Sequence, residues 1–75
     1  GKTWDVKRYR SVNSDGNAYD PVDTVDKLEK KDFANGEKVI FDDSLLTSKE
    51  INDTYKEFKK RGFDKDVIWW PTQPN

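Results

Sequence analysis

Residues 46–63, LTSKEINDTYKEFKKRGF, carry the signals of one well-bounded α-helix. Thr47 precedes Glu50 by three residues, which is the spacing of a capping box. An apolar stripe at helical spacing follows, made of Ile51, Tyr55 and Phe58. The last turn is rich in Lys and Arg, and Gly62 then fits the left-handed position that ends many helices. The pattern predicts a helix over residues 48–61.

Short apolar runs lie on both sides of this helix, KVIF at residues 38–41 and DVIWW at residues 66–70. Continuous apolar runs of this length are typical of strands that are covered on both faces. The succession of strand, helix and strand is compatible with two parallel strands joined by a right-handed crossover. This unit therefore sets the expected architecture.

The N-terminal third predicts a further strand and a further helix. Residues 3–12 alternate, with Trp4, Val6 and Val12 on one parity and Tyr9 on the other, so we expect a strand with Trp4 and Val6 in the core. Asp20 and Pro21 suit the cap and first position of a helix. Its apolar positions are Val22, Val25 and Leu28.

The stretch DFANGEKVIF, residues 32–41, has two readings. Gly36 ends an extended second helix, or Asn35 and Gly36 form a hairpin turn between two strands. We favour the first reading because only Phe33 supports a strand before the turn.

Together these elements predict a single small domain over residues 1–75 of the α+β or small α/β class. We expect a three-stranded sheet with two helices in the order β-α-β-α-β, with both helices on one face. Two prolines make residues 70–75 an extended C-terminal tail.

Consecutive tryptophans, Trp69 and Trp70, lie in the last predicted strand. Neighbouring side chains of a strand point to opposite faces, so only one of the two indoles can lie beneath the helices. We expect Trp69 to pack there with Phe41 and Val67, because Pro71 marks the end of the strand and its neighbour is left uncovered. Trp70 is then expected on the helix-free face.

Composition restricts the chemistry. The chain of 75 residues contains no Cys and no His, which excludes imidazole and thiol catalysis and the commonest zinc sites. No nucleophile-elbow or phosphate-loop motif is present, so we expect no enzyme activity and no cofactor. The apolar runs are too short for a membrane span.

An aromatic face without helices points to binding of a protein partner. The residues predicted to contact that partner are Tyr9, Ile40, Trp70 and Pro71. Two alternatives remain open: the tail folds back and covers the face, or the face forms a homodimer. The composition, rich in Asn, Asp and Lys and without Cys or Met, is typical of proteins from low-GC bacteria or their phages, and it assigns neither a function nor a cellular location.

Nucleic acid is the second class of partner to weigh. The first strand interleaves aromatic and basic residues, as single-strand binders do, and its predicted contacts are Lys7, Arg8, Tyr9 and Arg10. The net charge of −1 argues against it. A weaker alternative is a magnesium-type carboxylate or phosphate site at the strand end, at Asp42, Asp43 and Ser44.

Overall fold

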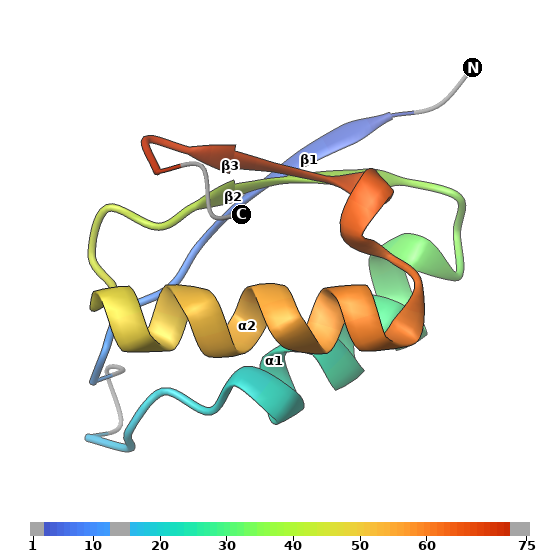
Figure 1. Cartoon of the computed structure of the whole chain (residues 1–75). Helices are drawn as coiled ribbons and strands as arrows, with labels where there is room; N and C mark the ends of the chain where they lie inside the picture. The colour runs from blue at the N-terminus through green and yellow to red at the C-terminus, as the bar shows by residue number, and fades with distance from the viewer. Residues whose placement is uncertain (1–2, 13–15, 73–75) are drawn as a thin grey trace.

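The computed structural model describes residues 3–12 and 16–72, and it confirms the predicted order of elements. Three parallel strands form one sheet in the order β1-β2-β3: β1 (Trp4–Arg8), β2 (Lys38–Asp42) and β3 (Val67–Trp70). The two α-helices are α1 (Pro21–Leu28) and α2 (Ser48–Arg61). Both lie on the same side of the sheet, and no element of the described chain covers the other side (Figure 1).

The topology explains why the helices share one face. The strands are parallel and follow one another in chain order across the sheet. Crossovers between parallel strands have one preferred hand, so two successive crossovers that move in the same direction place both helices on the same side. The uncovered face is thus a consequence of strand order.

Helix α2 begins and ends as its sequence predicts. The Thr47 side chain accepts a hydrogen bond from the Glu50 backbone N–H at 3.2 Å, and the Glu50 carboxylate accepts one from the Thr47 backbone N–H at 2.8 Å. Gly62 takes a left-handed conformation with φ of 82°, and the Phe63 N–H donates to the Phe58 carbonyl. These bonds satisfy backbone groups that a helix leaves open at its ends.

Helix α1 is capped by the Asp20 carboxylate, which accepts from the backbone N–H groups of Val22 and Asp23. The helix continues as a π-helical segment, η1 (Glu29–Phe33), and the chain turns at Gly36, whose φ is 77°. The reading with an extended helix is therefore confirmed. The hairpin reading is wrong, because β2 pairs in parallel with β1.

The core lies between the helices and one face of the sheet. Its residues are Val25, Leu28, Val39, Phe41, Ile51, Phe58, Val67 and Trp69. The Phe41 and Trp69 rings lie with centroids 4.6 Å apart, and the Phe58 ring meets both edge-on. The predicted packing of Trp69 with Phe41 and Val67 is thus confirmed, while Trp70 points to the uncovered face and is 58% exposed.

The N-terminal strand differs from its prediction. It covers only Trp4–Arg8, and Val12 pairs later in an isolated bridge with Ala18. Trp4 and Val6 are not in the core, because the register with β2 places Asp5 and Lys7 beside Val39 and Phe41, whose side chains face the helices.

The C-terminal segment also differs. Trp70 belongs to β3, a four-residue strand, and does not begin the tail. The Thr72 backbone N–H donates to the Asp43 carboxylate at 3.2 Å, and the predicted tail beyond residue 72 lies outside the described residues. In the described chain, neither helix has the length and apolar character needed to cross a membrane.

Candidate functional site

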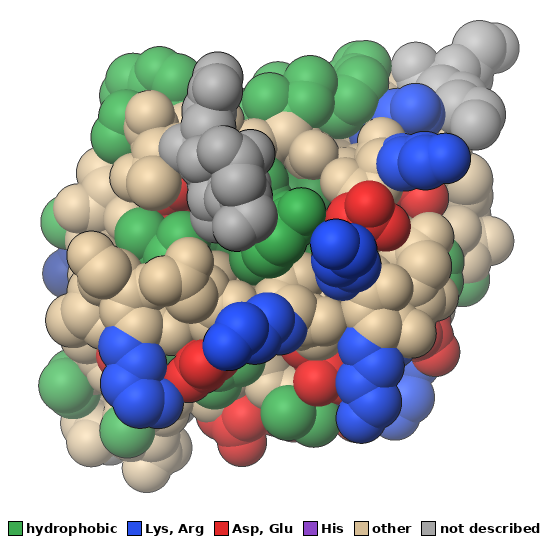
Figure 2. Space-filling model, viewed as in Figure 1, with side chains coloured by type: hydrophobic (Ala, Val, Ile, Leu, Met, Phe, Trp, Pro, Cys, Tyr) green, Lys and Arg blue, Asp and Glu red, His purple; other side chains and the backbone are tan. Residues whose placement is uncertain are grey.

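The helix-free side of the sheet, called here the open face, is the most apolar exposed surface that the strands build. Strand register aligns its side chains in three rows across the sheet. The rows are Trp4 with Lys38, then Val6 with Ile40 and Ile68, then Arg8 with Asp42 and Trp70. In Figure 2, hydrophobic side chains project along the upper edge of the molecule, on the side of the sheet away from the helices.

The middle row is aliphatic and largely open to solvent. Val6 is 63% exposed and Ile68 is 49% exposed, whereas Ile40 lies half-buried between them. Exposed indoles stand at diagonally opposite corners, Trp4 at the start of β1 and Trp70 at the end of β3. A contiguous apolar surface of this kind usually marks a contact site.

Cations border this apolar surface. Lys38 Nζ lies 5.4 Å from the centroid of the Trp4 ring and 4.0 Å from Asp66 Oδ1. At the other end of the sheet, Arg8 Nε donates to Asp42 Oδ2 at 2.9 Å. The Asp42 side chain is almost fully covered, whereas the Arg8 side chain is 58% exposed. The exposed part of this ion pair is therefore the positively charged guanidinium.

Asp42 is held as a carboxylate by its neighbours. Its pKa is lowered to about 2, first because the Ser44 hydroxyl and backbone N–H donate to Oδ1, and then because Arg8 donates to Oδ2. Donors from the protein thus occupy both oxygens. The charge-assisted hydrogen bond to Asp42 in turn holds the Arg8 side chain at the edge of the open face.

The predicted partner-binding residues divide between the two faces. Ile40 and Trp70 lie on the open face, and Pro71 is exposed directly after β3. Tyr9 does not join them, and its prediction as an anchor of this face is wrong. It follows Arg8 with the opposite parity, so its ring packs beneath the sheet against Phe41, with a centroid separation of 5.2 Å. Burial raises the Tyr9 pKa to about 12.

Three apolar residues of the open face were missed by the sequence prediction, namely Trp4, Val6 and Ile68. Ile68 shares its parity with Trp70, so the alternation of the strand could have identified it. Trp4 and Val6 could not be identified in this way, since an apolar parity beside a charged one normally marks the buried side.

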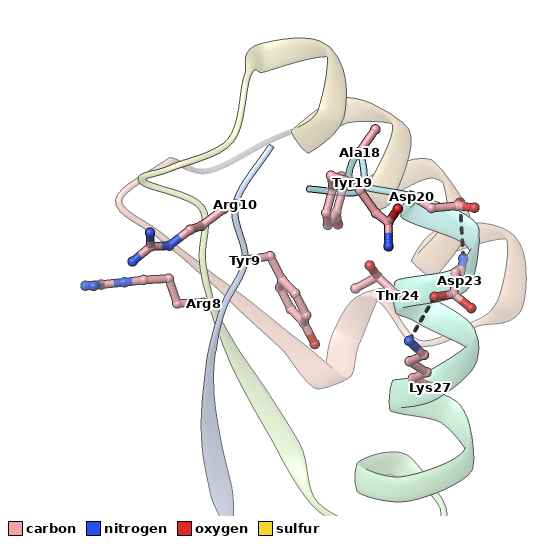
Figure 3. Close-up of a pocket in the computed structure, with 10 residues that line it drawn as sticks. Arg8, Tyr9, Arg10, Ala18, Tyr19, Asp20, Asp23, Thr24 and Lys27 are labelled. Carbon is pink, nitrogen blue, oxygen red and sulfur yellow. Dashed lines mark hydrogen bonds and ion pairs between the residues drawn. The ribbon is translucent and has the colours of Figure 1, made fainter. Parts of the chain in front are cut away.

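The residues predicted to bind nucleic acid are also split. Lys7 points to the helix side, where its Nζ lies 3.1 Å from Asp5 Oδ2 and 3.9 Å from Asp32 Oδ2. Tyr9 is in the layer beneath the sheet, whereas the Arg8 and Arg10 side chains point together away from Tyr9 (Figure 3). Only the two arginines share a surface.

The alternative of a carboxylate metal site is not supported by the geometry. Asp43 is buried, and its Oδ1 accepts from the Thr72 backbone N–H, while Asp42 is occupied by Ser44 and Arg8. Within residues 3–12 and 16–72, no three potential ligands of the His, Cys, Asp or Glu type come together.

A polar cavity of about 480 Å³ lies between the end of β1 and the start of α1 (Figure 3). Tyr9 and Tyr19 form part of its wall, with ring centroids 6.0 Å apart. Other polar groups of the cavity have partners within the chain: the Tyr19 hydroxyl lies 2.7 Å from Thr54 Oγ1, and Lys27 pairs with Asp23 at 3.0 Å. This cavity is less suited to recognition than the open face, because most of its charged side chains, Arg10 apart, already have partners within the described chain.

Comparison with protein-family models, with curated proteins and with solved structures finds no match to this chain, so its function has to be argued from the open face itself.

Proposed function

We propose that this protein is a non-catalytic binding module that contacts a protein partner through the open face. The observation that carries the proposal is the aliphatic row of Val6, Ile40 and Ile68, which crosses the whole sheet between two exposed indoles. Trp70 and Pro71 extend the contact surface at the end of β3.

The type of sheet supports this proposal. Purely parallel sheets occur almost only where both faces are covered, because their strands are apolar on both sides. Here the chain order of the strands places both helices on one face. A partner that covers the open face would complete the layering that such sheets normally have.

The reversed polarity of β1 gives independent support. Its outward side chains, Trp4 and Val6, are apolar, whereas its inward side chains, Asp5 and Lys7, are charged. A strand at the edge of a solvated sheet would ordinarily have the opposite arrangement. Apolar residues on the solvent side of this strand are best explained by contact with another molecule.

A protein partner fits the open face better than nucleic acid does. Single strands are held by successive aromatic rings on which bases stack. On this face the two exposed indoles are separated by a row of aliphatic side chains, which offers bases no stacking surface. Aliphatic and aromatic side chains together are the usual centre of a protein interface.

Site-specific photo-cross-linking tests the proposal. A benzophenone side chain at Val6, on the open face, should give discrete cross-linked protein species in extracts of the source cells. The same group at Lys56, exposed on the outer side of α2, is the matched control. The species should be lost when Ile68→Asp is added, because a carboxylate in the aliphatic row must be desolvated on docking.

Two results would contradict the proposal. Identical species from both positions would show that cross-linking is not specific to the open face. Species that nuclease treatment removes would identify the partner as nucleic acid.

A further inference from the structure

We infer that the occupant of the open face is a single amphipathic α-helix of the partner, with an apolar stripe flanked by carboxylates. The helix would lie on the sheet as a third layer, opposite α1 and α2. This inference rests on the proposed function and adds the chemistry of the partner.

The dimensions of the sheet favour one helix. Neighbouring strands lie about 4.8 Å apart, so the backbones of three strands span roughly 10 Å. An α-helix with its side chains is about 10–12 Å in diameter. Strands of four and five residues extend about 13–17 Å. About three helical turns cover that length, since each residue adds about 1.5 Å.

The shape of the surface also suits a helix. The aliphatic row of Val6, Ile40 and Ile68 is low and crosses the middle of the sheet, and the larger Trp4 and Trp70 stand at opposite corners. A helix laid along the other diagonal of the sheet would pass over the middle of the row, where its apolar stripe would pack, and would contact an indole on each side. Helix-in-surface recognition of this kind uses residues spaced three and four apart.

A second copy of this chain is a poorer occupant. The three-stranded face offers a footprint of only a few hundred Å², whereas stable interfaces bury about 800 Å² on each partner. A face-to-face dimer would also enclose two copies of Arg8, each with its guanidinium on the contact surface. Like charges in a buried contact oppose association.

The charges specify the flanks of the partner helix. Arg8 and Arg10 project side by side at the carboxyl end of β1 (Figure 3). The carboxylate that Arg8 binds is itself covered, and among the described residues Arg10 makes no ion pair. Glutamates beside the apolar stripe would pair with these two guanidinium groups, whereas lysines there would be repelled.

Synthetic helices provide the test. Two hydrocarbon-stapled peptides of about 12 residues carry the same Leu stripe, one flanked by Glu and one by Lys, and a third has the Glu composition with its stripe scrambled. Binding is followed through the indole N–H signals of the ¹⁵N-labelled full chain by NMR. Trp69, which is 8% exposed beneath the helices, serves as the internal reference.

We expect the Glu-flanked helix to shift the Trp4 and Trp70 signals and to leave the Trp69 signal in place. Its affinity at low salt should exceed that of the Lys-flanked helix about five-fold, as one exposed ion pair can supply. Arg10→Glu should remove this preference. Lys56→Glu, the control with the same charge change on α2, should preserve it.

The outcomes separate the inference from the proposed function. Equal binding of all three peptides, or shifts confined to Trp69, would overturn the choice of an acidic amphipathic helix. If no peptide binds while Val6 still cross-links to a protein, the helix inference fails and the proposed function stands. If an oligonucleotide shifts Trp4 and Trp70 and no protein cross-links, both fail. Concentration-dependent dimerisation in sedimentation that Ile68→Asp abolishes would replace the helix with a second copy.

Discussion

Asp32 shows how the inward charges of β1 are accommodated. Its side chain is buried in the π-helical segment, and Oδ2 makes no hydrogen bond to the described residues, with Lys7 Nζ 3.9 Å away. Burial is the first cause that raises the pKa of Asp32, and the adjoining Asp5 carboxyl is the second. The positive charge of Lys7 lowers the pKa of Asp32, whereas the negative charge of Glu37 raises it by a smaller amount. The carboxyl group is therefore a local source of instability at neutral pH.

Asp32→Asn should stabilise the protein at pH 7 by on the order of 1 kcal/mol, because a neutral amide of the same size costs less to bury than a carboxylate. A folded-state pKa above the unfolded value means that stability is present at low pH and is lost as pH rises through the folded pKa. The stability difference between variant and wild type should therefore be small near pH 4 and grow toward pH 7. Urea unfolding at both pH values measures it.

Asp64→Asn, at the surface turn before β3, is the control for the loss of one negative charge. If Asp32→Asn changes the free energy of unfolding by the same amount at pH 4 and pH 7, this explanation is contradicted. It is also contradicted if Asp64→Asn changes the free energy of unfolding as much as Asp32→Asn does.

Thr54 is a fully buried hydroxyl on α2. It donates to the Glu50 carbonyl at 2.7 Å and also lies 2.7 Å from the Tyr19 hydroxyl, which joins α2 to the segment before α1. Burial raises the Tyr19 pKa to about 12, although the hydrogen bonds to Thr54 and Thr24 oppose that rise. Removal of either partner leaves a buried hydroxyl with one bond fewer.

Thr54→Val and Tyr19→Phe should each destabilise the fold by about 1 kcal/mol. The double variant should cost about 0.5–1 kcal/mol less than the sum, because the second substitution removes a group that the first has already left unpaired. Chemical denaturation of the four proteins in this cycle measures the coupling. Strict additivity would mean that the contact contributes nothing to stability.

At the scale of elements, helix α2 could be predicted almost completely, because its signals are local. The capping box of Thr47 and Glu50 and the left-handed Gly62 depend only on residues next to each other in sequence. The side to which β1 turns its apolar residues could not be predicted, since it depends on pairing with β2, 34 residues further along the chain. The register with Val39 and Phe41 decides it.

The last turn of α2 offers a prediction on backbone conformation alone. A Cβ at Gly62 would meet no atom within 4 Å beyond its neighbours in the chain, so a substitution there is penalised only by the φ of 82°. Gly62→Ala should cost about 1–2 kcal/mol, and Gly62→Asn should cost less, since Asn tolerates the left-handed region. Thermal unfolding compares them. Equal losses for Ala and Asn would contradict the conformational explanation.

At the scale of the whole molecule, the core and the proposed binding surface lie on opposite faces of one thin sheet. The residues that hold the fold together lie between the sheet and the helices, whereas Val6 and Ile68 contribute to the open face alone. Val6→Thr and Ile68→Thr should each change the free energy of unfolding by less than about 1 kcal/mol. Phe58→Ala, in the core, should cost about 3–5 kcal/mol. Urea titrations measure the free energy of unfolding of these variants. Comparable losses of stability for the open-face and core variants would mean that the open face also holds the fold together.

The three tryptophans report directly on this division. Trp69 is 8% exposed, whereas Trp4 is 42% and Trp70 is 58% exposed. In the isolated protein a soluble quencher such as acrylamide should therefore reach two indoles readily and the third poorly, which gives a downward-curved quenching plot. Trp70→Phe should reduce the fraction of the fluorescence that the quencher reaches and leave the protected emission unchanged.

A partner on the open face should protect Trp4 and Trp70 together, because they stand on either side of the same aliphatic row. Protection of all three indoles in the protein alone would show that the chain covers its own sheet, and no docking surface would then remain.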